Sequence, residues 1–475
     1  MSGRQEVLPF TRLPCLGFPG CRILTVNHSE SVLTHGNLNR AIRILAVPMV
    51  LEMSMESVFA VADVFFVGRI GTDAVAIVGL TEAFLFLVYA VSFGLAIGTT
   101  ALVARRIGEQ RQEIATRVAV QANWLGLLVS VPIAIVGLVW TERLLTLMGA
   151  TPELAAFGAE YLAISLGGNA VIMLLFINNA VFRGAGDAKM AMWSLWIANG
   201  MNLILDPCLI FGLGPFPELG LKGAAIATVI GRGAGVVYQM LRLFRGRGVI
   251  RLSGTRLRPH LEGMIRLARL SFGGMAQQLV ETTSWLILVR IISSSGAAAL
   301  AGYTIAFRIL SFVFLPAWGL ANAAATLVGQ NLGAGRPDRA ERATWIISFY
   351  AAGFLFVIML IFIPLAETLI RLFTSEPEVV RIGEQCLRVV SYGYVFFAFG
   401  MVMTEAFNGA GDTMTPAWLH VVTLWLIKLP LALVLANALG YGPIGVFSAV
   451  TISYGILAVL AIIIFRRGRW KERVV

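Results

Sequence analysis

Charged residues are scarce in this sequence of 475 residues, where they make up 13% of the chain. Ordinary soluble proteins carry about 25% charged residues and roughly 45–50% apolar ones, whereas hydrophobic residues reach 58% here. Apolar runs of about twenty residues, long enough to cross a bilayer core of about 30 Å, recur along nearly the whole chain. The composition therefore excludes an ordinary soluble protein and predicts a polytopic helical membrane protein.

Cysteine and histidine are also scarce, with four of each. The cysteines lack the spacing of a metal site or a CxxC motif, so we expect neither a disulfide framework nor a structural metal. No GxSxG, HExxH or Walker loop occurs. An intramembrane enzyme would need a nucleophile–base pair or metal ligands at bilayer depth, where His420 is the one candidate histidine. We therefore expect no enzymatic activity and no bound cofactor.

The net charge of +11 is in the range of nucleic-acid-binding proteins, but its placement argues against that partner. The basic residues lie in alternate short loops between apolar runs, at about 105–117, 183–189, 244–258, 336–342 and 466–473. By the positive-inside rule this pattern predicts cytoplasmic termini. The expected surroundings are the lipids of a bacterial inner (plasma) membrane.

The sequence contains a long internal repeat. FRGAGDAKMAMW begins at Phe182 and FNGAGDTMTPAW begins at Phe407, and 407 − 182 = 225. The same step places LVARRIGEQR, from Leu102, over LVGQNLGAGR, from Leu327. A repeat of this length indicates that one unit of about half the chain is used twice. The glycines of the two GAGD loops favour a tight turn between helices over a substrate contact.

The predicted fold is all-α, with 12 transmembrane helices in two pseudo-symmetric lobes of six. In the first lobe, 39–243, the spans are expected at about 41–68, 75–103, 115–140, 157–181, 190–212 and 223–243. In the second lobe, 263–466, they are expected at about 266–292, 298–328, 343–366, 382–406, 415–436 and 443–465. The remaining segments are a flexible cytoplasmic tail, a cytoplasmic linker and a basic cytoplasmic C-terminus, at 1–38, 244–262 and 467–475. Each lobe has an even number of spans, so the repeat is parallel in the membrane.

Span one carries three carboxylates at bilayer depth: Glu52, Glu56 and Asp63. At 100° per residue, Glu56 lies about 40° and Asp63 about 20° from Glu52, so the three share one helical face over about 16 Å. A charge within a span is costly and is by default a candidate functional site. This face is predicted to point into a cavity or the bundle interior rather than to lipid.

Span five carries Asn199, Asn202 and Asp206 within about 60° of one another. Asn202 and Asp206 are i,i+4 neighbours, able to share a proton or coordinate a small cation. Thr228 of span six supplies a hydroxyl at a similar depth. The alternative is a hydrogen-bonded network that only fixes helix packing.

Span seven offers a second polar face, with Gln277, Glu281 and Ser284 at i, i+4 and i+7. Lys428 of span eleven has two readings that the sequence leaves open. Its long side chain reaches the outer interface, or it meets a carboxylate across the cleft.

Several segments carry a family resemblance: ADVFFVGRIGTDAVA, FRGAGD, NGMNLILDPCLIFG, LGLKGAAIAT, AFRILSFVFLPAWGLANAAATLVGQNLGAG and FNGAGDT. In this order, with six plus six spans, the chain resembles the multidrug and toxic compound extrusion (MATE) transporters over about residues 40–465. The resemblance implies two six-helix lobes in a V around a central cavity. It also implies export of small organic, often cationic, molecules in exchange for H⁺ or Na⁺.

Carried over motif by motif, the family's span-one acid falls on Asp63, its Asn-x₃-Asp on Asn202 and Asp206, and its span-six hydroxyl on Thr228. This set is similar to the N-lobe cation site of the proton-coupled, DNA-damage-inducible branch. The resemblance therefore implies that H⁺ or Na⁺ binds at these residues.

Glu281 matches the span-seven acid of other branches, which also tend to carry an acid in span ten. The corresponding stretch here, 392–399, has none, which argues against a coupling site in the second lobe. Glu52 and Glu56 do not belong to the family pattern. They make the cavity more acidic and favour cationic substrates, so we group them with Asn199, Gln277, Glu281 and Ser284 as candidate cavity residues.

The main alternative is a flippase for lipid-linked precursors, which related folds provide. It predicts a cationic cavity for a pyrophosphate and commonly two extra spans, and the sequence indicates neither. We expect a monomer. The sequence does not name the substrate, and it does not choose between H⁺ and Na⁺, because carboxylate and amide oxygens suit both ions.

Overall fold

The computed structural model describes residues 32–246, 248–252 and 257–473. Most of the predicted N-terminal tail, 1–31, lies outside these residues, as do parts of the predicted linker and the last two residues of the C-terminus. Within the described ranges the regular structure is helical, and no strand is present.

The first half of the chain forms six crossings and one short connecting helix. The helices are α2 (Leu38–Gly68), α3 (Thr72–Gly108), α4 (Gln112–Val139), α5 (Thr141–Leu147), α6 (Pro152–Gly167), α7 (Asn169–Gly184), α8 (Ala188–Phe211) and α9 (Gly220–Arg245). Helices α6 and α7 follow each other directly and together make one candidate span, Pro152–Gly184.

The second half repeats this order with more breaks. The helices are α10 (Leu261–Ser293), α11 (Ala297–Gly333), α12 (Pro337–Arg371), α13 (Pro377–Ser391), α14 (Tyr394–Ala410), α15 (Met414–His420), η1 (Val421–Lys428), α16 (Leu429–Leu433), η2 (Val434–Ala438), α17 (Pro443–Arg466) and η3 (Arg469–Glu472). The stretch from α15 to η2 is one crossing, in which η1 and η2 are π-helical.

Hydropathy and geometry together confirm a bundle of twelve crossings. Among the described residues, 10 helices are long and apolar enough to span a membrane, and the bent pair α13–α14 makes an eleventh. The twelfth is α10, which is less apolar because it carries Gln277, Gln278 and Glu281, but which packs along α3 inside the bundle.

The tenth crossing is not the single helix that we predicted at 382–406, because α13 and α14 meet at an angle of 56°. At the bend the Gly393 N–H donates to the carbonyl of Val390 and leaves the carbonyl of Val389 outside the helical ladder. The Thr451 hydroxyl of α17 donates to Val389 O at 2.8 Å. A side chain that satisfies a freed carbonyl in this way stabilises a kink within the membrane.

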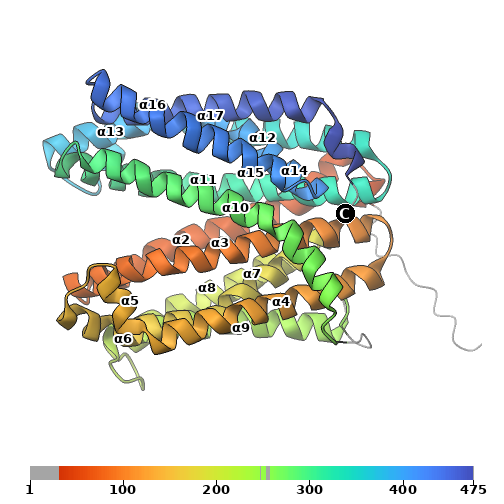
Figure 1. Ribbon diagram of the computed structural model, residues 1–475, viewed down its shortest axis with the longest axis horizontal. Coiled ribbons are helices and arrows are strands. Elements are labelled where there is room, and N and C mark those ends of the chain that lie inside the picture. Colours follow the sequence, from red (N-terminus) through yellow and green to blue (C-terminus); the bar gives the residue numbers. More distant parts are fainter. Residues whose placement is uncertain (1–31, 247, 253–256, 474–475) are drawn as a thin grey trace, which may run out of the picture.

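The helices lie in two groups with roughly parallel axes, α2–α9 and α10–α17 (Figure 1). We call them the N-lobe and the C-lobe. The end of the bundle where α2 begins and α17 ends is called the basic end. It carries the basic loop residues Arg105, Arg106, Arg111, Arg242, Arg336 and Arg466.

The lobes approach each other closely near the basic end, where small residues let α3 and α11 touch. A Cβ added to Gly108 would overlap the carbonyl oxygen of Gln330, and one added to Gly333 would overlap the carbonyl oxygen of Arg105. The Gln330 side chain also donates to Gly184 O at 2.9 Å. The two lobes are therefore closed against each other at the basic end.

The two GAGD loops have nearly identical turn geometry. Gly186 has φ +85° and Gly411 has φ +83°, a region that glycine adopts readily. In each turn the following aspartate N–H donates to the phenylalanine carbonyl, Asp187 to Phe182 at 2.9 Å and Asp412 to Phe407 at 3.0 Å. Both loops thus close helix hairpins, as the sequence favoured.

Residues 32–38 differ from the flexible tail that we expected for 1–38. The Leu33 side chain is only 2% exposed and belongs to the C-lobe core. Its carbonyl accepts hydrogen bonds from the Arg339 side chain at 3.3 Å and from Asn331 at 3.4 Å. An apolar side chain and a satisfied backbone hold this segment against the basic end.

Candidate functional site

Helix α8 presents three polar side chains to the interior of the N-lobe. Asn199, Asn202 and Asp206 are each at most 1% exposed. The preferred amide orientation of Asn202 donates to Asp206 Oδ2 at 2.7 Å and accepts from the N–H and the hydroxyl of Thr228, both at 3.1 Å. The structure thus brings Asn202, Asp206 and Thr228 together as the sequence predicted.

Asp63 of α2 lies on the same side of the N-lobe and is partly exposed. It interacts electrostatically with Asp206 and with Arg232 of α9. The carboxylates of α2 and α8 therefore share one electrostatic environment.

Glu56 faces the same interior. Its Oε2 accepts from the Asn199 amide at 2.8 Å, and its Oε1 lies 3.8 Å from an Arg232 guanidinium nitrogen. The guanidinium also lies over two rings, 5.7 Å from the centroid of Phe59 and 5.6 Å from that of Tyr89. Arg232 is 5% exposed, so it is a counter-ion buried within this acidic cluster.

Glu52 has a different setting from the cavity-facing position that we expected. It is fully buried, and its Oε1 accepts from the Asn179 amide at 3.1 Å and from Arg183 at 3.2 Å. A buried charge requires such a partner. The face that Glu52 shares with Glu56 and Asp63 points into the helices of the N-lobe, where Glu52 ties α2 to α7.

The candidate residues of α10 have three separate environments. The Gln277 amide donates to Asn408 Oδ1 at 3.0 Å and accepts from the Asn408 amide at 3.2 Å. The Ser284 hydroxyl donates to the carbonyl of Leu424 at 3.1 Å, which is a packing contact. Glu281 is exposed.

Lys428 fits neither of the two readings that the sequence left open. Its side chain is 7% exposed, so it does not reach the outer interface. It interacts electrostatically with Glu281 of α10, which belongs to the same lobe, so this interaction does not cross the cleft.

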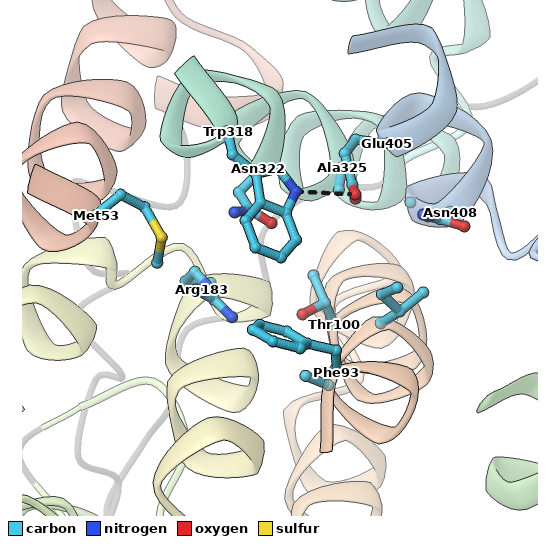
Figure 2. A pocket seen from close by; sticks show the side chains of 12 residues that line it. Met53, Phe93, Thr100, Arg183, Trp318, Asn322, Ala325, Glu405 and Asn408 are labelled. Carbon is cyan, nitrogen blue, oxygen red and sulfur yellow. Dashed lines mark hydrogen bonds between the residues drawn. The ribbon is translucent and has the colours of Figure 1, made fainter. Parts of the chain in front are cut away.

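A small pocket lies between the lobes. Its lining comes from α2, α3, α7, α11 and α14: Met53, Phe93, Ala96, Ile97, Thr100, Arg183, Trp318, Asn322, Ala325, Glu405, Asn408 and Gly409. Figure 2 shows the rings of Phe93 and Trp318 next to each other, with Arg183 on one side and Glu405 joined to the indole by a dashed line. None of our six candidate cavity residues is in this lining.

Glu405 is the acidic residue of the pocket. It is 7% exposed, and its Oε1 accepts from the indole N–H of Trp318 at 3.3 Å. It belongs to the tenth crossing, just beyond the stretch 392–399 in which we found no acid. The sequence analysis considered only 392–399 and so did not reach this residue.

Sequence reasoning missed Arg183, Arg232 and Glu405. Arg183 was assigned to a loop, but α7 continues through it and buries it to 7% exposure. Arg232 and Glu405 each had a usable signal, because a charge within a long apolar run marks a candidate site. Their partners come from distant helices and could not be read from helical periodicity.

The oxygen atoms of Asp63, Asn202, Asp206 and Thr228 are the hard ligands that a small cation prefers. Among the described residues, no group of three or more His, Cys, Asp or Glu side chains is placed to hold a metal ion. A Na⁺ bound in the N-lobe would therefore rely on amide and hydroxyl oxygens as well as carboxylates.

Comparisons with known proteins agree with this architecture. The MatE family model matches residues 48–208 and 275–434. The probable multidrug resistance protein NorM of Thermotoga maritima is 28% identical over 436 residues, which cover 91% of this chain and 93% of that protein. The FAD transporter of Shewanella oneidensis is 25% identical over 399 residues, 83% of this chain and 87% of that protein.

The fold is also that of solved structures. One is described as the outward-facing conformation of a multidrug resistance MATE family transporter of the MOP superfamily. It superposes with a TM-score of 0.88 at 26% identity and covers 94% of this chain and 99% of that one.

Proposed function

Because this chain belongs to the MATE family of membrane transporters, we propose that it is a secondary active antiporter. It exports organic compounds, cationic ones among them, in exchange for H⁺ or Na⁺. The observation that carries this proposal is the buried acidic cluster in the N-lobe of a two-lobed membrane protein. Carboxylates at bilayer depth are costly and mark ion pathways and proton relays.

The coupling ion binds at Asp206, with Asn202 and Thr228 as neighbours and Asp63 as the second carboxylate. A proton or Na⁺ that neutralises these acids weakens their attraction to Arg232. Because Arg232 also contacts Glu56 and the ring of Phe59 on α2, ion binding changes the forces on α2. Helix α2 packs against α11 of the other lobe. A change in the position of α2 on ion binding can therefore change the contact between the lobes.

Alternating access follows from the two-lobed fold. If the positive-inside rule holds, the basic end faces the cytoplasm. The lobes are closed at that end, as an outward-facing state requires. Ion entry from outside then promotes substrate release, and rocking of the lobes reopens the basic end.

An anionic substrate is the second candidate, because one relative is named an FAD transporter. The pocket between the lobes favours it less. Its basic residue, Arg183, is paired with Glu52 at 3.2 Å, and its acid is Glu405. A pocket with one paired basic residue and one acidic residue also argues against a flippase for a pyrophosphate-linked lipid.

The test is transport in proteoliposomes that contain purified protein in its monomeric form, with rhodamine 6G as the organic cation. A pH gradient alone and a Na⁺ gradient alone are imposed on wild type and on Asp206→Asn. We expect one gradient to drive accumulation in wild type and neither to do so in the variant. No movement of the cation under either gradient in wild type would contradict the proposal.

A further inference from the structure

Helices α3 and α11 are equivalent in the two lobes, and α3 leaves the C-lobe toward the end where both helices begin. We call this end, opposite the basic end, the far end. A Cβ added to Gly108 would overlap the carbonyl oxygen of Gln330. Gly79 lies about 20° from Gly108 on the same face of α3, yet no described atom lies within 4 Å of its added Cβ. The lobes therefore touch near the basic end and separate toward the far end.

Glu82 lies on the face of α3 that is turned toward the C-lobe. It precedes Phe86 by one helical turn, and the centroid of the Phe86 ring lies 6.0 Å from that of Trp285 in α10. The Glu82 side chain is exposed. At 1.5 Å per residue it lies about 15 Å from the start of α3. This carboxylate therefore lies at the edge of the contact between the lobes, on the side of the far end.

Arg308 is a basic residue of α11 at a similar depth. Because 319 − 308 = 11, it lies about 20° from Gly319 on the same helical face. A Cβ added to Gly319 would overlap the carbonyl oxygen of Met49 in α2, so this face is turned toward the N-lobe. Arg308 is exposed and lies about 16–17 Å from the start of α11. The two lobes thus present opposite charges toward each other at one level of the bundle.

These two charges are near each other but not paired. Glu82 interacts electrostatically with Arg308 and with Asp63, which is a like charge. Within the part of the chain that the structure describes, neither Glu82 nor Arg308 has an oppositely charged group within 4.0 Å. A charge at bilayer depth is costly and usually has a partner. A direct contact between them requires the lobes to approach at the far end.

We propose that Glu82 and Arg308 form an ion pair between the lobes when the far end closes, and that this pair stabilises the state in which the basic end is open. Rocking that separates α3 from α11 at the basic end brings their far halves together. An interaction made in only one of two states shifts the equilibrium toward that state. This inference rests on the proposed alternating access, and it names a contact that the cycle makes and breaks.

Charge reversal in proteoliposomes tests the pair. Glu82→Arg or Arg308→Glu alone places like charges opposite each other and should slow gradient-driven accumulation of rhodamine 6G by about tenfold or more. The double variant carries the pair with reversed polarity and should recover most of the transport. The matched control is Glu142→Arg, the same reversal at an exposed carboxylate of α5 in the N-lobe, which should keep transport within about twofold of wild type.

A distance measurement follows the far end without relying on transport. Spin labels are attached to Thr72→Cys and Ser295→Cys, exposed positions of the two lobes at the far end, in protein without its native cysteines. In lipid nanodiscs, Glu82→Gln and Arg308→Gln should each reduce the fraction of short distances by about the same factor. Combining them should add little, because either change alone already removes the pair. These neutral variants also serve if the charge-reversed proteins do not fold.

The proposal is overturned if the double reversal is no more active than the single reversals, or if the neutral variants leave the distance distribution of wild type unchanged. The proposed antiport fails separately, when wild type accumulates no rhodamine 6G under either gradient. The spin-label measurement then still decides whether Glu82 and Arg308 pair at the far end.

Discussion

The two lobes share a backbone plan but differ in chemistry at equivalent positions. The repeat step of 225 places Asp63 over Leu288 and Asp206 over Leu431. The same step places Arg232 over Leu457. At these three positions the N-lobe has two acids and a buried counter-ion where the C-lobe has leucines, and Glu56 alone of the cluster has an acidic equivalent, Glu281.

One pair of positions shows how the same contact is made in two ways. Glu52 and Arg183 form an ion pair of 3.2 Å in the N-lobe, and the repeat places Gln277 and Asn408 over them. These two form a reciprocal amide pair of 3.0 and 3.2 Å. The contact at these positions can therefore form without charged side chains. The ion pair in the N-lobe thus indicates a functional role beyond helix packing.

The comparison shows that the two copies keep one fold while their charged side chains have diverged. The N-lobe concentrates carboxylates of the kind that suit a coupling ion. The C-lobe contributes Glu405, whose equivalent in the N-lobe is Ala180, to the pocket between the lobes. On the proposed mechanism, ion binding belongs mainly to the N-lobe.

The largest expected effect is the loss of ion coupling in the N-lobe. Asp63→Asn should reduce gradient-driven accumulation of rhodamine 6G in proteoliposomes at least about a hundredfold, a loss typical of removing an essential charged group. Glu281 is the acid of the C-lobe at the position equivalent to Glu56. Accumulation by Glu281→Gln should still be driven by the ion gradient. Equal losses in the two variants would contradict a division of tasks.

The next largest effect is on stability. It is expected when the ion pair of the N-lobe is replaced by an amide pair like that of the C-lobe. Glu52→Gln leaves Arg183 buried without a counter-charge and should lower the free energy of unfolding by about 3–5 kcal/mol. Adding Arg183→Asn recreates the amide pair of the C-lobe and should restore most of that loss.

Denaturant titration of the purified protein in detergent measures both variants, with wild type and Arg183→Asn completing a double-mutant cycle. A double variant as unstable as Glu52→Gln would show that the amide pair cannot replace the ion pair in the N-lobe.

A smaller effect concerns the contact between the lobes. Gly108→Ala should push α3 away from Gln330 and open the basic end, at a cost of about 1–3 kcal/mol for overpacking. A maleimide that cannot cross membranes should then modify a cysteine at position 322 faster from the basic end, in protein without its native cysteines. Gly353→Ala is the control, because nothing lies within 4 Å of its added Cβ.

The smallest effect is expected from removing the ion pair between Arg473, near the C-terminus, and the second GAGD loop. Arg473 pairs with Asp412 at 3.2 Å and is half-exposed. Exposed ion pairs contribute about 0–1 kcal/mol. Arg473→Ala should therefore keep transport within about twofold of wild type, and a larger loss would assign this loop a role in the cycle.

The sequence predicted the elements that depend on local pattern. Long apolar runs predicted the crossings, and the 225-residue repeat predicted two lobes. Helical spacing also placed Asn202 and Asp206 on one face, and the depth of Thr228 in span six added this residue, which indeed contacts Asn202.

Features that depend on neighbouring helices escaped prediction. Spacing shows which residues share a face of α2, but not that Glu52 meets Arg183 while Glu56 meets Arg232. The pocket at Glu405 is assembled from five helices that are distant in sequence. The bend in the tenth crossing depends on a hydroxyl of α17, Thr451, and no local pattern reveals it.

The most direct test of the central claim measures binding and driven transport on the same preparations of wild type and Asp206→Asn. We predict that Asp206→Asn binds rhodamine 6G with an unchanged Kd but no longer accumulates it under an ion gradient. If Asp206→Asn accumulated rhodamine 6G as wild type does, or lost binding and accumulation together, Asp206 would not be the ion-coupling residue.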